Sequence, residues 1–263
     1  MTLQEQTQNI LGRLPQEKGL QDWSILFTYR GSIAHGTYIP NNDSNSIDDV
    51  DLIGVCIPSL DYYFGLSEFG SRGTVEIKQD ELDIVIYEFK KMVNLLVGCN
   101  PNVLNLLYLR PEYYLKVTPA GQMLLDNRDL FLSKQAYHKY TAYAKGQFDA
   151  MKKNKYNGYM GEKRKQLVDK FSYDCKNASH LIRLLRMGKE ILESGQVIAY
   201  READRDELIA IKTGHWSFEE VQAEALKLFR ECDELVNDCQ LPERADKGKV
   251  NELCVNILKA HFG

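Results

Sequence analysis

The sequence lacks several features that would place it in a special class of protein. No apolar run approaches the roughly 20 residues that a helix needs to cross a bilayer. Residues 1–14 are polar and rich in glutamine, so we expect no signal peptide. The six cysteines are scattered and no pair has C-x-x-C spacing, which favours reduced thiols in a cytoplasmic protein over a zinc site. We also find no internal repeat and no low-complexity segment.

The sequence also has no excess of positive charge. The chain has 33 Lys and Arg against 37 Asp and Glu, which gives a formal net charge of −4. The protein as a whole is therefore no polycation, and any contact with nucleic acid must come from a local basic patch. With 263 residues, 44% of them hydrophobic, the chain is long enough for one large domain or two small ones with a sizeable core.

The segment 29–57 is the part of the sequence that suggests chemistry. An apolar strand at 25–27 leads into Arg30-Gly31-Ser32 and a short helical turn. Gly31 tolerates backbone angles that other residues avoid and lets the chain approach a ligand closely. Ser32 then falls where the N–H groups of a helix are unpaired, which is a favourable place for phosphate.

Two carboxylates follow at the start of another apolar strand. Asp49 and Asp51 are separated by one residue, so on a strand they project to the same face, whereas Asp48 projects to the other. Two carboxylates on one face repel unless a cation lies between them, and such oxygen ligands suit Mg²⁺. The alternative is that both are ordinary surface carboxylates.

A third carboxylate lies on a later strand. Residues 74–78 and 82–88 both alternate between apolar and polar side chains, which predicts a hairpin. Because strands that follow one another often pair, we expect Asp83 to lie next to the strand of Asp49 and Asp51. The alternative is an ordinary residue at a strand edge.

From residue 89 onward the pattern becomes helical. Asn100 before Pro101, and Thr118 before Pro119, are typical N-caps. We place the boundary between a catalytic domain, 1–110, and a helical domain that binds nucleotide and substrate, 111–263. The predicted helices of this second domain are about 119–127, 133–153, 166–193, 203–211, 217–237 and 242–260.

The helix predicted over 166–193 presents a row of cations. Lys176, His180 and Arg183 recur at i, i+4 and i+7 and so share one face, with Arg186 on the neighbouring ridge. Arginine and lysine both bind phosphate oxygens, and Tyr173 offers a ring for base stacking. The alternative is a solvated helix face.

A basic stretch with interleaved tyrosines precedes that helix. Tyrosine rings permit base stacking and the positive charges attract phosphate, so this stretch is a candidate contact with RNA, the alternative being simple solvent-exposed charge. Its members are Lys152, Lys153, Lys155, Tyr156, Tyr159, Lys163, Arg164 and Lys165.

The order of these motifs resembles the nucleotidyltransferase core of the DNA polymerase beta superfamily and, within it, the RNA repair pathway DNA polymerase beta family. The resemblance covers roughly residues 25–215. It is carried by five ordered segments, namely Arg30-Gly31-Ser32-Ile33-Ala34-His35-Gly36-Thr37, 49–55, 82–91, 100–104 and 176–188.

The resemblance implies an α+β fold, with a small mixed nucleotidyltransferase sheet and flanking helices followed by a helical C-terminal domain. It implies that Asp49, Asp51 and Asp83 hold two Mg²⁺ ions and that Asp83 activates the attacking hydroxyl. A nucleoside triphosphate would be bound by the residues Gly31, Ser32, Tyr173, Lys176, His180, Arg183 and Arg186.

The activity implied is a nucleotidyltransferase of the EC 2.7.7 type. It would move a nucleoside monophosphate from the triphosphate to an acceptor hydroxyl, most simply at an RNA or tRNA end. Two alternatives stay open at this point. One is transfer to a protein side chain or a small molecule, and the other is a non-catalytic protein that binds nucleotide or RNA. A binder needs no base, so the complete set of three aspartates favours an enzyme.

Overall fold

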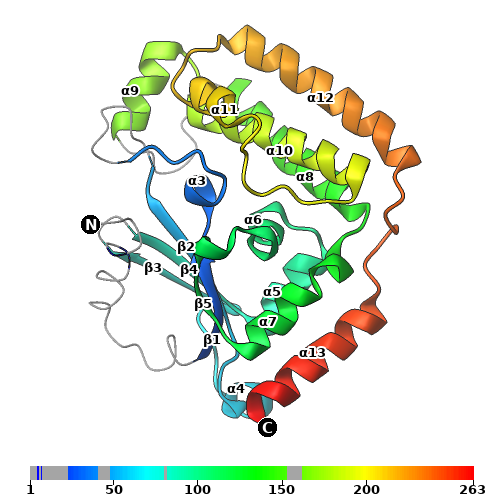
Figure 1. Cartoon of the computed structure of the whole chain (residues 1–263). Helices are drawn as coiled ribbons and strands as arrows, with labels where there is room; N and C mark the ends of the chain where they lie inside the picture. The colour runs from blue at the N-terminus through cyan, green and yellow to red at the C-terminus, as the bar shows by residue number, and fades with distance from the viewer. Residues whose placement is uncertain (1–4, 6, 8–22, 41–47, 80–81, 153–161) are drawn as a thin grey trace.

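The structure is a computed structural model that describes residues 5, 7, 23–40, 48–79, 82–152 and 162–263. One sheet, in the part of the chain before residue 118, lies below a group of helices from the later part (Figure 1). Its strands are β1 Ser24–Tyr29, β2 Val50–Cys56, β3 Thr74–Gln79, β4 Leu82–Glu88 and β5 Tyr114–Val117. The fold is thus mixed α and β with a helical C-terminal region, as predicted.

The five strands have the order β3-β4-β2-β1-β5. β2 and β4 are parallel, whereas the other neighbours are antiparallel, so the sheet is mixed. The predicted hairpin of β3 and β4 is confirmed, and β4 lies beside β2 as expected. This order brings the two central parallel strands, which carry Asp51 and Asp83, together in the middle of the sheet.

Side chains alternate between the two faces of β2. Ile53 and Val55 belong to the main core that the sheet shares with the helices. Val50, Leu52 and Cys56 point to the opposite face and pack in a second, smaller core. Because alternate residues share a face, Asp51 lies on the same side of β2 as Ile53 and therefore faces the helices.

Short helices surround the sheet. α5 begins where the buried carboxylate of Glu88 accepts hydrogen bonds from two backbone N–H groups, and α6 begins after the predicted Asn100 cap. Thr118 caps α7, also as predicted. The elements are α3 Gly31–Ala34, α4 Leu60–Phe64, α5 Phe89–Val97, α6 Pro101–Leu104, η1 Asn105–Tyr108, η2 Pro111–Tyr113, α7 Pro119–Asp126 and η3 Arg128–Phe131.

The C-terminal helices are organised around α10, which packs against four of the others, α8, α9, α11 and α12. Gly195, with φ +67°, ends α10 in the left-handed conformation that glycine favours. The helices are α8 Gln135–Lys152, α9 Glu162–Phe171, α10 Cys175–Ser194, α11 Arg205–Lys212, α12 Phe218–Asp238 and α13 Lys247–Phe262. No helix in the described ranges is both long and apolar enough to cross a membrane.

The predicted continuous helix over 166–193 is wrong, because the chain breaks between α9 and α10. Ser172 has φ +62°, which ends α9, and the side chain of Asp174 then accepts a hydrogen bond from the N–H of Asn177 to begin α10. The pattern of apolar residues continues through the break, so periodicity alone does not reveal it. The last helix also starts later than predicted, at Lys247 after the Asp246 cap.

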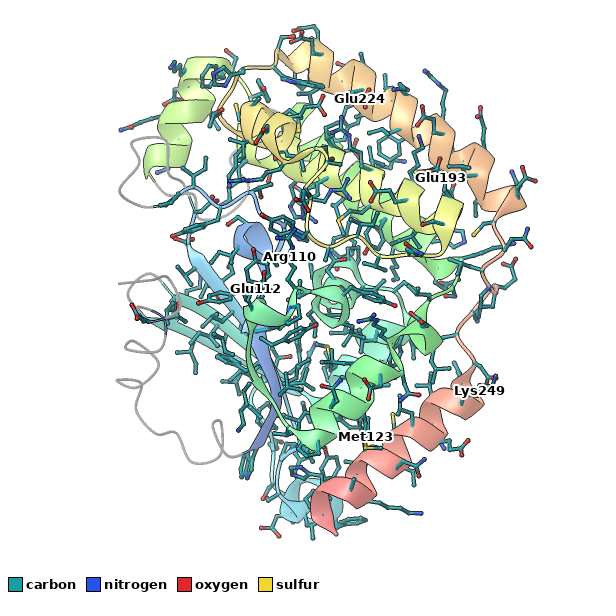
Figure 2. The ribbon with its side chains drawn as sticks, viewed as in Figure 1. Arg110, Glu112, Met123, Glu193, Glu224 and Lys249 are labelled. Carbon is teal, nitrogen blue, oxygen red and sulfur yellow. The ribbon has the colours of Figure 1, made fainter. Side chains whose placement is uncertain are left out.

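The sheet part and the helical part share one core. β5 lies beyond residue 110, yet it pairs with β1 and completes the sheet. At the junction lies Arg110, which Figure 2 labels. Its guanidinium stacks 3.6 Å from the centre of the Tyr200 ring and donates to Glu202 at 2.8 Å. The division at residue 110 remains a prediction, and these contacts link the segment before β5 to the segment between α10 and α11.

Candidate active site

Asp51 and Asp83 lie side by side on the helix-facing surface of the sheet. They are direct partners in the parallel register of β2 and β4. Nη2 of Arg30, which directly follows β1, lies 3.5 Å from Oδ1 of each carboxylate. Nζ of Lys78 lies 3.9 Å from the other oxygen of Asp83. The two carboxylates therefore converge on one positive group, which is the arrangement that a cation-binding pair needs.

Gly31 brings the backbone against Asp51. Its φ is +62°, and a Cβ at this position would lie 2.4 Å from Oδ2 of Asp51. Any other residue would thus be strained and would displace the carboxylate. Ser32 follows in the first turn of α3, where its carbonyl accepts a hydrogen bond of 2.8 Å from Thr37. The contact of Ser32 with phosphate stays a prediction.

Asp49 lies one residue before β2 and is exposed. Within the described ranges, no three His, Cys, Asp or Glu side chains are gathered closely enough to hold a metal ion. The three-carboxylate magnesium site therefore stays a prediction, of which the fold assembles the pair Asp51 and Asp83.

The charge of Asp51 is incompletely compensated. Burial raises the pKa of its carboxyl to about 6, against the opposing effect of Arg30 and Lys176, and the negative charges of Asp83 and Asp49 raise the pKa too. Because burial destabilises the ionised carboxylate, a cation that binds beside it stabilises its negative charge. The pair therefore fits Mg²⁺, which would compete with the Arg30 guanidinium for the same oxygens.

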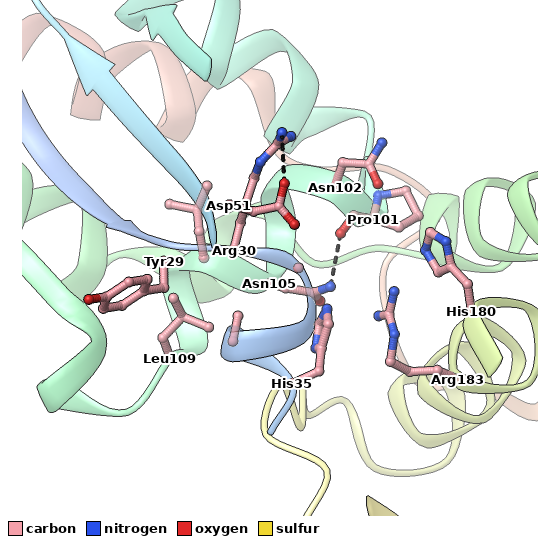
Figure 3. Close-up of a pocket in the computed structure, with 13 residues that line it drawn as sticks. Tyr29, Arg30, His35, Asp51, Pro101, Asn102, Asn105, Leu109, His180 and Arg183 are labelled. Atoms are coloured by element: carbon pink, nitrogen blue, oxygen red, sulfur yellow. Dashed lines mark hydrogen bonds and ion pairs between the residues drawn. The ribbon is translucent and has the colours of Figure 1, made fainter. Parts of the chain in front are cut away.

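A pocket of about 210 Å³ opens beside Asp51, the member of the carboxylate pair that lines it. Four segments far apart in the sequence line it, and Figure 3 shows His180 and Arg183 reaching in from α10 on the side opposite Asp51. The volume lies below the ~300–1,000 Å³ typical of sites for drug-sized ligands, so the pocket encloses only part of a nucleotide. The lining includes Arg30, Gly31, His35, Asp51, Pro101, Asn102, Asn105, His180 and Arg183.

Arg183 is a cation without a carboxylate partner among the described residues. Nη1 lies 3.3 Å from the sulfur of Met187, and no salt bridge to Arg183 is formed within these ranges. Burial lowers the pKa of Arg183 to about 10, so the guanidinium is still charged at neutral pH. A half-buried positive charge that faces a cavity favours an anionic ligand, and phosphate oxygens match its planar donors.

Lys176 lies between the pocket and a buried ion cluster. Its Nζ is 3.5 Å from Oδ1 of Asp48, while its charge also lowers the pKa of Asp51. Asp48 is buried and pairs with Lys212 of α11, and its Oδ2 accepts from the N–H of Ile39 at 3.0 Å. Asp48 thus holds the chain before β2 against α10 and α11, a role that the sequence analysis did not assign to it.

Arg186 forms salt bridges with three carboxylates of its own chain. Its guanidinium pairs with Asp204, Glu207 and Glu224, which come from the N-cap and first turn of α11 and from α12. It does not line the pocket. These contacts hold α10, α11 and α12 together, so we do not retain Arg186 as a nucleotide-binding residue.

Tyr173 is also part of the helical core. Its side chain is buried, its hydroxyl donates to the carbonyl of Trp216 at 2.6 Å, and its ring packs against Phe218. The residue lies in the break between α9 and α10 rather than on the cationic face of α10. The expected stacking of a base on Tyr173 finds no support in this position.

The predicted RNA contact lies largely outside the described residues. This applies to Lys153, Lys155, Tyr156 and Tyr159 and to the side chains of Lys152, Lys163 and Arg164. Lys165 lies on α9 and is exposed. The role of the stretch therefore stays a prediction.

Two further residues line the pocket, Asn105, to which the sequence assigned no role, and His35, which it indicated as structural with contact to nucleotide as the alternative. Asn105 is held by the carbonyl of Pro101 at 2.9 Å and by the hydroxyl of Tyr140 at 3.0 Å. His35 is buried, with Nδ1 2.8 Å from the carbonyl of Ala199. The sequence signal for His35 is its place directly after the Gly31-Ser32 turn, because its partner Ala199 is distant in the sequence.

Three comparisons relate the chain to known proteins. The model of the RNA repair pathway DNA polymerase beta family matches residues 4–256. No curated protein matches significantly. A crystal structure of a nucleotidyltransferase-like protein from Exiguobacterium sibiricum 255-15 aligns with 10% identity and a TM-score of 0.31, over 90% of this chain and 75% of that one, and this similarity is too low to decide fold or function.

The family match spans almost the whole chain and includes the sheet, the carboxylate pair and α10. The chain therefore belongs to the RNA repair pathway DNA polymerase beta family, a family of nucleotidyltransferases of the polymerase beta type.

Proposed function

We propose that the chain transfers a nucleoside monophosphate from a nucleoside triphosphate to a hydroxyl at an RNA end, with Mg²⁺ as its cofactor. The observation that carries this proposal is the pocket that joins Asp51 on the sheet to Arg183 on α10. A negative wall and a positive wall around one cavity suit a polyphosphate that carries a metal ion, because the metal approaches the carboxylates while the remaining phosphate charge faces the cations.

We assign two roles to the carboxylates, binding of the metal ion and acceptance of a proton. Asp51 and Asp83, joined by Asp49 from the chain before β2, would hold Mg²⁺, which supplies Lewis-acid stabilisation of charge at the reacting phosphorus. We assign Asp83 to accept the proton of the acceptor hydroxyl. Gly31 permits this use of Asp51, since the absence of a Cβ leaves room for the carboxylate.

We assign the binding of the phosphates to the cations of α10. Arg183 and His180 face the pocket, and Lys176 is near enough to Asp51 to lower the pKa of its carboxyl. These positive charges would neutralise the triphosphate and the leaving pyrophosphate. Ser32 and the N–H groups of the α3 turn are assigned to the β- and γ-phosphates.

RNA as acceptor is supported by the family and by the basic stretch. The family description refers to an RNA repair pathway. The lysines and tyrosines between α8 and α9 have the composition of a single-stranded nucleic-acid contact. The exposed Lys165 is the part of this stretch whose side chain the structure describes.

The direct test is to incubate the purified protein with each of the four α-³²P-labelled triphosphates, Mg²⁺ and total RNA. We expect RNA to become labelled, and we expect Asp51→Asn to abolish the transfer. Asp61→Asn is the matched control, because Asp61 is an exposed carboxylate on α4, outside the pocket. Label on protein would refute the RNA acceptor, and full activity of Asp51→Asn would refute the assignment of the carboxylates.

A further inference from the structure

His35 presents an unpaired hydrogen-bond acceptor to the pocket. It is 5% exposed and lines the cavity together with Asp51 and Arg183. Nδ1 lies 2.8 Å from the carbonyl oxygen of Ala199. Because a carbonyl oxygen can only accept, Nδ1 must carry the hydrogen. In the neutral ring, Nε2 then holds a lone pair.

The ring is kept neutral by its surroundings. Burial is the main cause that lowers the pKa of His35 well below its usual value, and the charge of Arg183 adds to this effect, as do His180 and Arg201 more weakly. The hydrogen bond to Ala199 opposes the shift. At neutral pH, Nε2 is therefore an acceptor and not a donor.

The position of the ring is fixed from two sides. The carbonyl of His35 accepts a hydrogen bond of 3.1 Å from Arg201, so residues 199–201 hold both the backbone and the ring. Gly36 follows with φ +73°, and a Cβ there would lie 2.5 Å from the ring of Tyr200. The lone pair of Nε2 is thus preorganised and cannot turn away easily.

No residue that the structure describes forms a hydrogen bond with Nε2. An acceptor that faces a pocket without a protein partner is satisfied by water, so an occupant that displaces this water should provide a donor in its place. Phosphate oxygens do not meet this need, because they are acceptors at neutral pH and would face the lone pair directly. The groups of a nucleotide that donate are the sugar hydroxyls and the N–H groups of the base.

We propose that His35 binds an O–H or N–H donor of the nucleotide through Nε2 and thereby helps to decide which nucleotide is used. This inference rests on the proposed function, since it assumes that a nucleotide occupies the pocket. Arg183 and His180 would bind the phosphates of the ligand, and His35 would accept a hydrogen bond from its sugar or base. A site built around a buried acceptor discriminates against analogues that lack the donor.

The test is calorimetric titration of the whole protein with ATP, GTP, CTP and UTP in Mg²⁺ buffer, each also in its 2′-deoxy and 3′-deoxy form. If the donor is a sugar hydroxyl, loss of that hydroxyl should weaken binding about five- to tenfold for every base. If the donor belongs to the base, the wild type should instead prefer some bases by a similar factor. In His35→Phe, which cannot accept a hydrogen bond, the ratio of the two dissociation constants that defines either preference should fall to about one.

Two further proteins separate this effect from damage to the fold. His35→Gln places an acceptor near the position of Nε2 and should restore part of the preference. His215→Phe, which changes an exposed histidine outside the pocket, should behave as the wild type. Because each preference is a ratio measured within one protein, a smaller folded fraction does not change it.

The outcomes are distinct. If no triphosphate binds, the proposed function fails and this inference fails with it. If triphosphates bind and His35→Phe keeps every wild-type ratio, the inference alone fails, and Nε2 is satisfied by a bound water only.

Discussion

Arg183 and Arg186 lie three residues apart on α10, yet their surroundings differ completely. Arg186 is paired with three carboxylates that come from the start of α11 and from α12. Arg183 faces the pocket and is paired with no carboxylate of the described chain. The difference teaches that a cation paired with carboxylates stabilises the packing of helices, whereas a cation that faces a cavity without a carboxylate partner is available to an anionic ligand.

Replacing Arg183 should separate activity from stability. Arg183→Met keeps the length of the side chain but removes the charge and the donors that we assign to phosphate. We expect kcat/KM for the triphosphate to fall by about 10²–10³-fold, while the melting temperature stays equal or rises. Unchanged kinetics, measured under the labelling conditions above, would remove Arg183 from the site.

Replacing Arg186 should give the opposite result. Arg186→Met leaves three carboxylates close together, and because the side chain is 15% exposed, solvent screens part of the cost. We expect a loss of about 2–3 kcal/mol in the free energy of unfolding, measured in urea, with kcat/KM of the folded protein little changed. A large loss of triphosphate affinity without a loss of stability would break the comparison and return Arg186 to the site.

Asp51, on the other side of the pocket, should behave like Arg183, because its replacement should lower activity and raise stability. The pKa of Asp51 is raised to about 6 from an unfolded value of 3.8, so its ionised form destabilises the fold. This cost is fully present above pH 6 and disappears as the pH falls to about 4, because the carboxyl is then protonated in both states.

We therefore expect Asp51→Asn to be more stable than the wild type by about 1–2 kcal/mol at pH 7, after allowance for partial exposure, and not more stable near pH 4. Urea titrations at several pH values measure this difference. An advantage that is equal at both pH values would contradict the electrostatic explanation.

Tyr173 gives the smallest effect. Tyr173→Phe removes the hydrogen bond to the carbonyl of Trp216 and nothing from the pocket. We expect about 1 kcal/mol less stability and unchanged triphosphate affinity. If affinity falls in this variant while the fold is intact, the stacking role that the sequence first indicated is correct.

The sequence was sufficient for features that depend on neighbours in the chain. Alternation along 82–88 placed Asp83 on a strand, and the tendency of successive strands to pair placed that strand beside Asp51. The caps at Asn100 and Thr118 follow from local chemistry in the same way. These features need no knowledge of the rest of the molecule.

Features that depend on distant partners could not be read in this way. The pairing of Asp48 with Lys212 and the hydrogen bond of His35 to Ala199 each join residues that are 164 positions apart. Arg186 looked equivalent to Arg183 because helical spacing shows only which side chains share a face. Whether a cation meets a carboxylate or a cavity is decided by the packing of α11 and α12 against α10.

The central claim is that the carboxylates of the sheet and the cations of α10 act on one metal-bound triphosphate. Calorimetric titration with a non-hydrolysable α,β-methylene triphosphate, with and without Mg²⁺, tests it most directly. We predict that Mg²⁺ lowers Kd at least about tenfold in the wild type, that Asp51→Asn loses this gain, and that Arg183→Met binds more weakly in both buffers. A Kd that is independent of Mg²⁺, or one that is the same in all three proteins, would contradict the account.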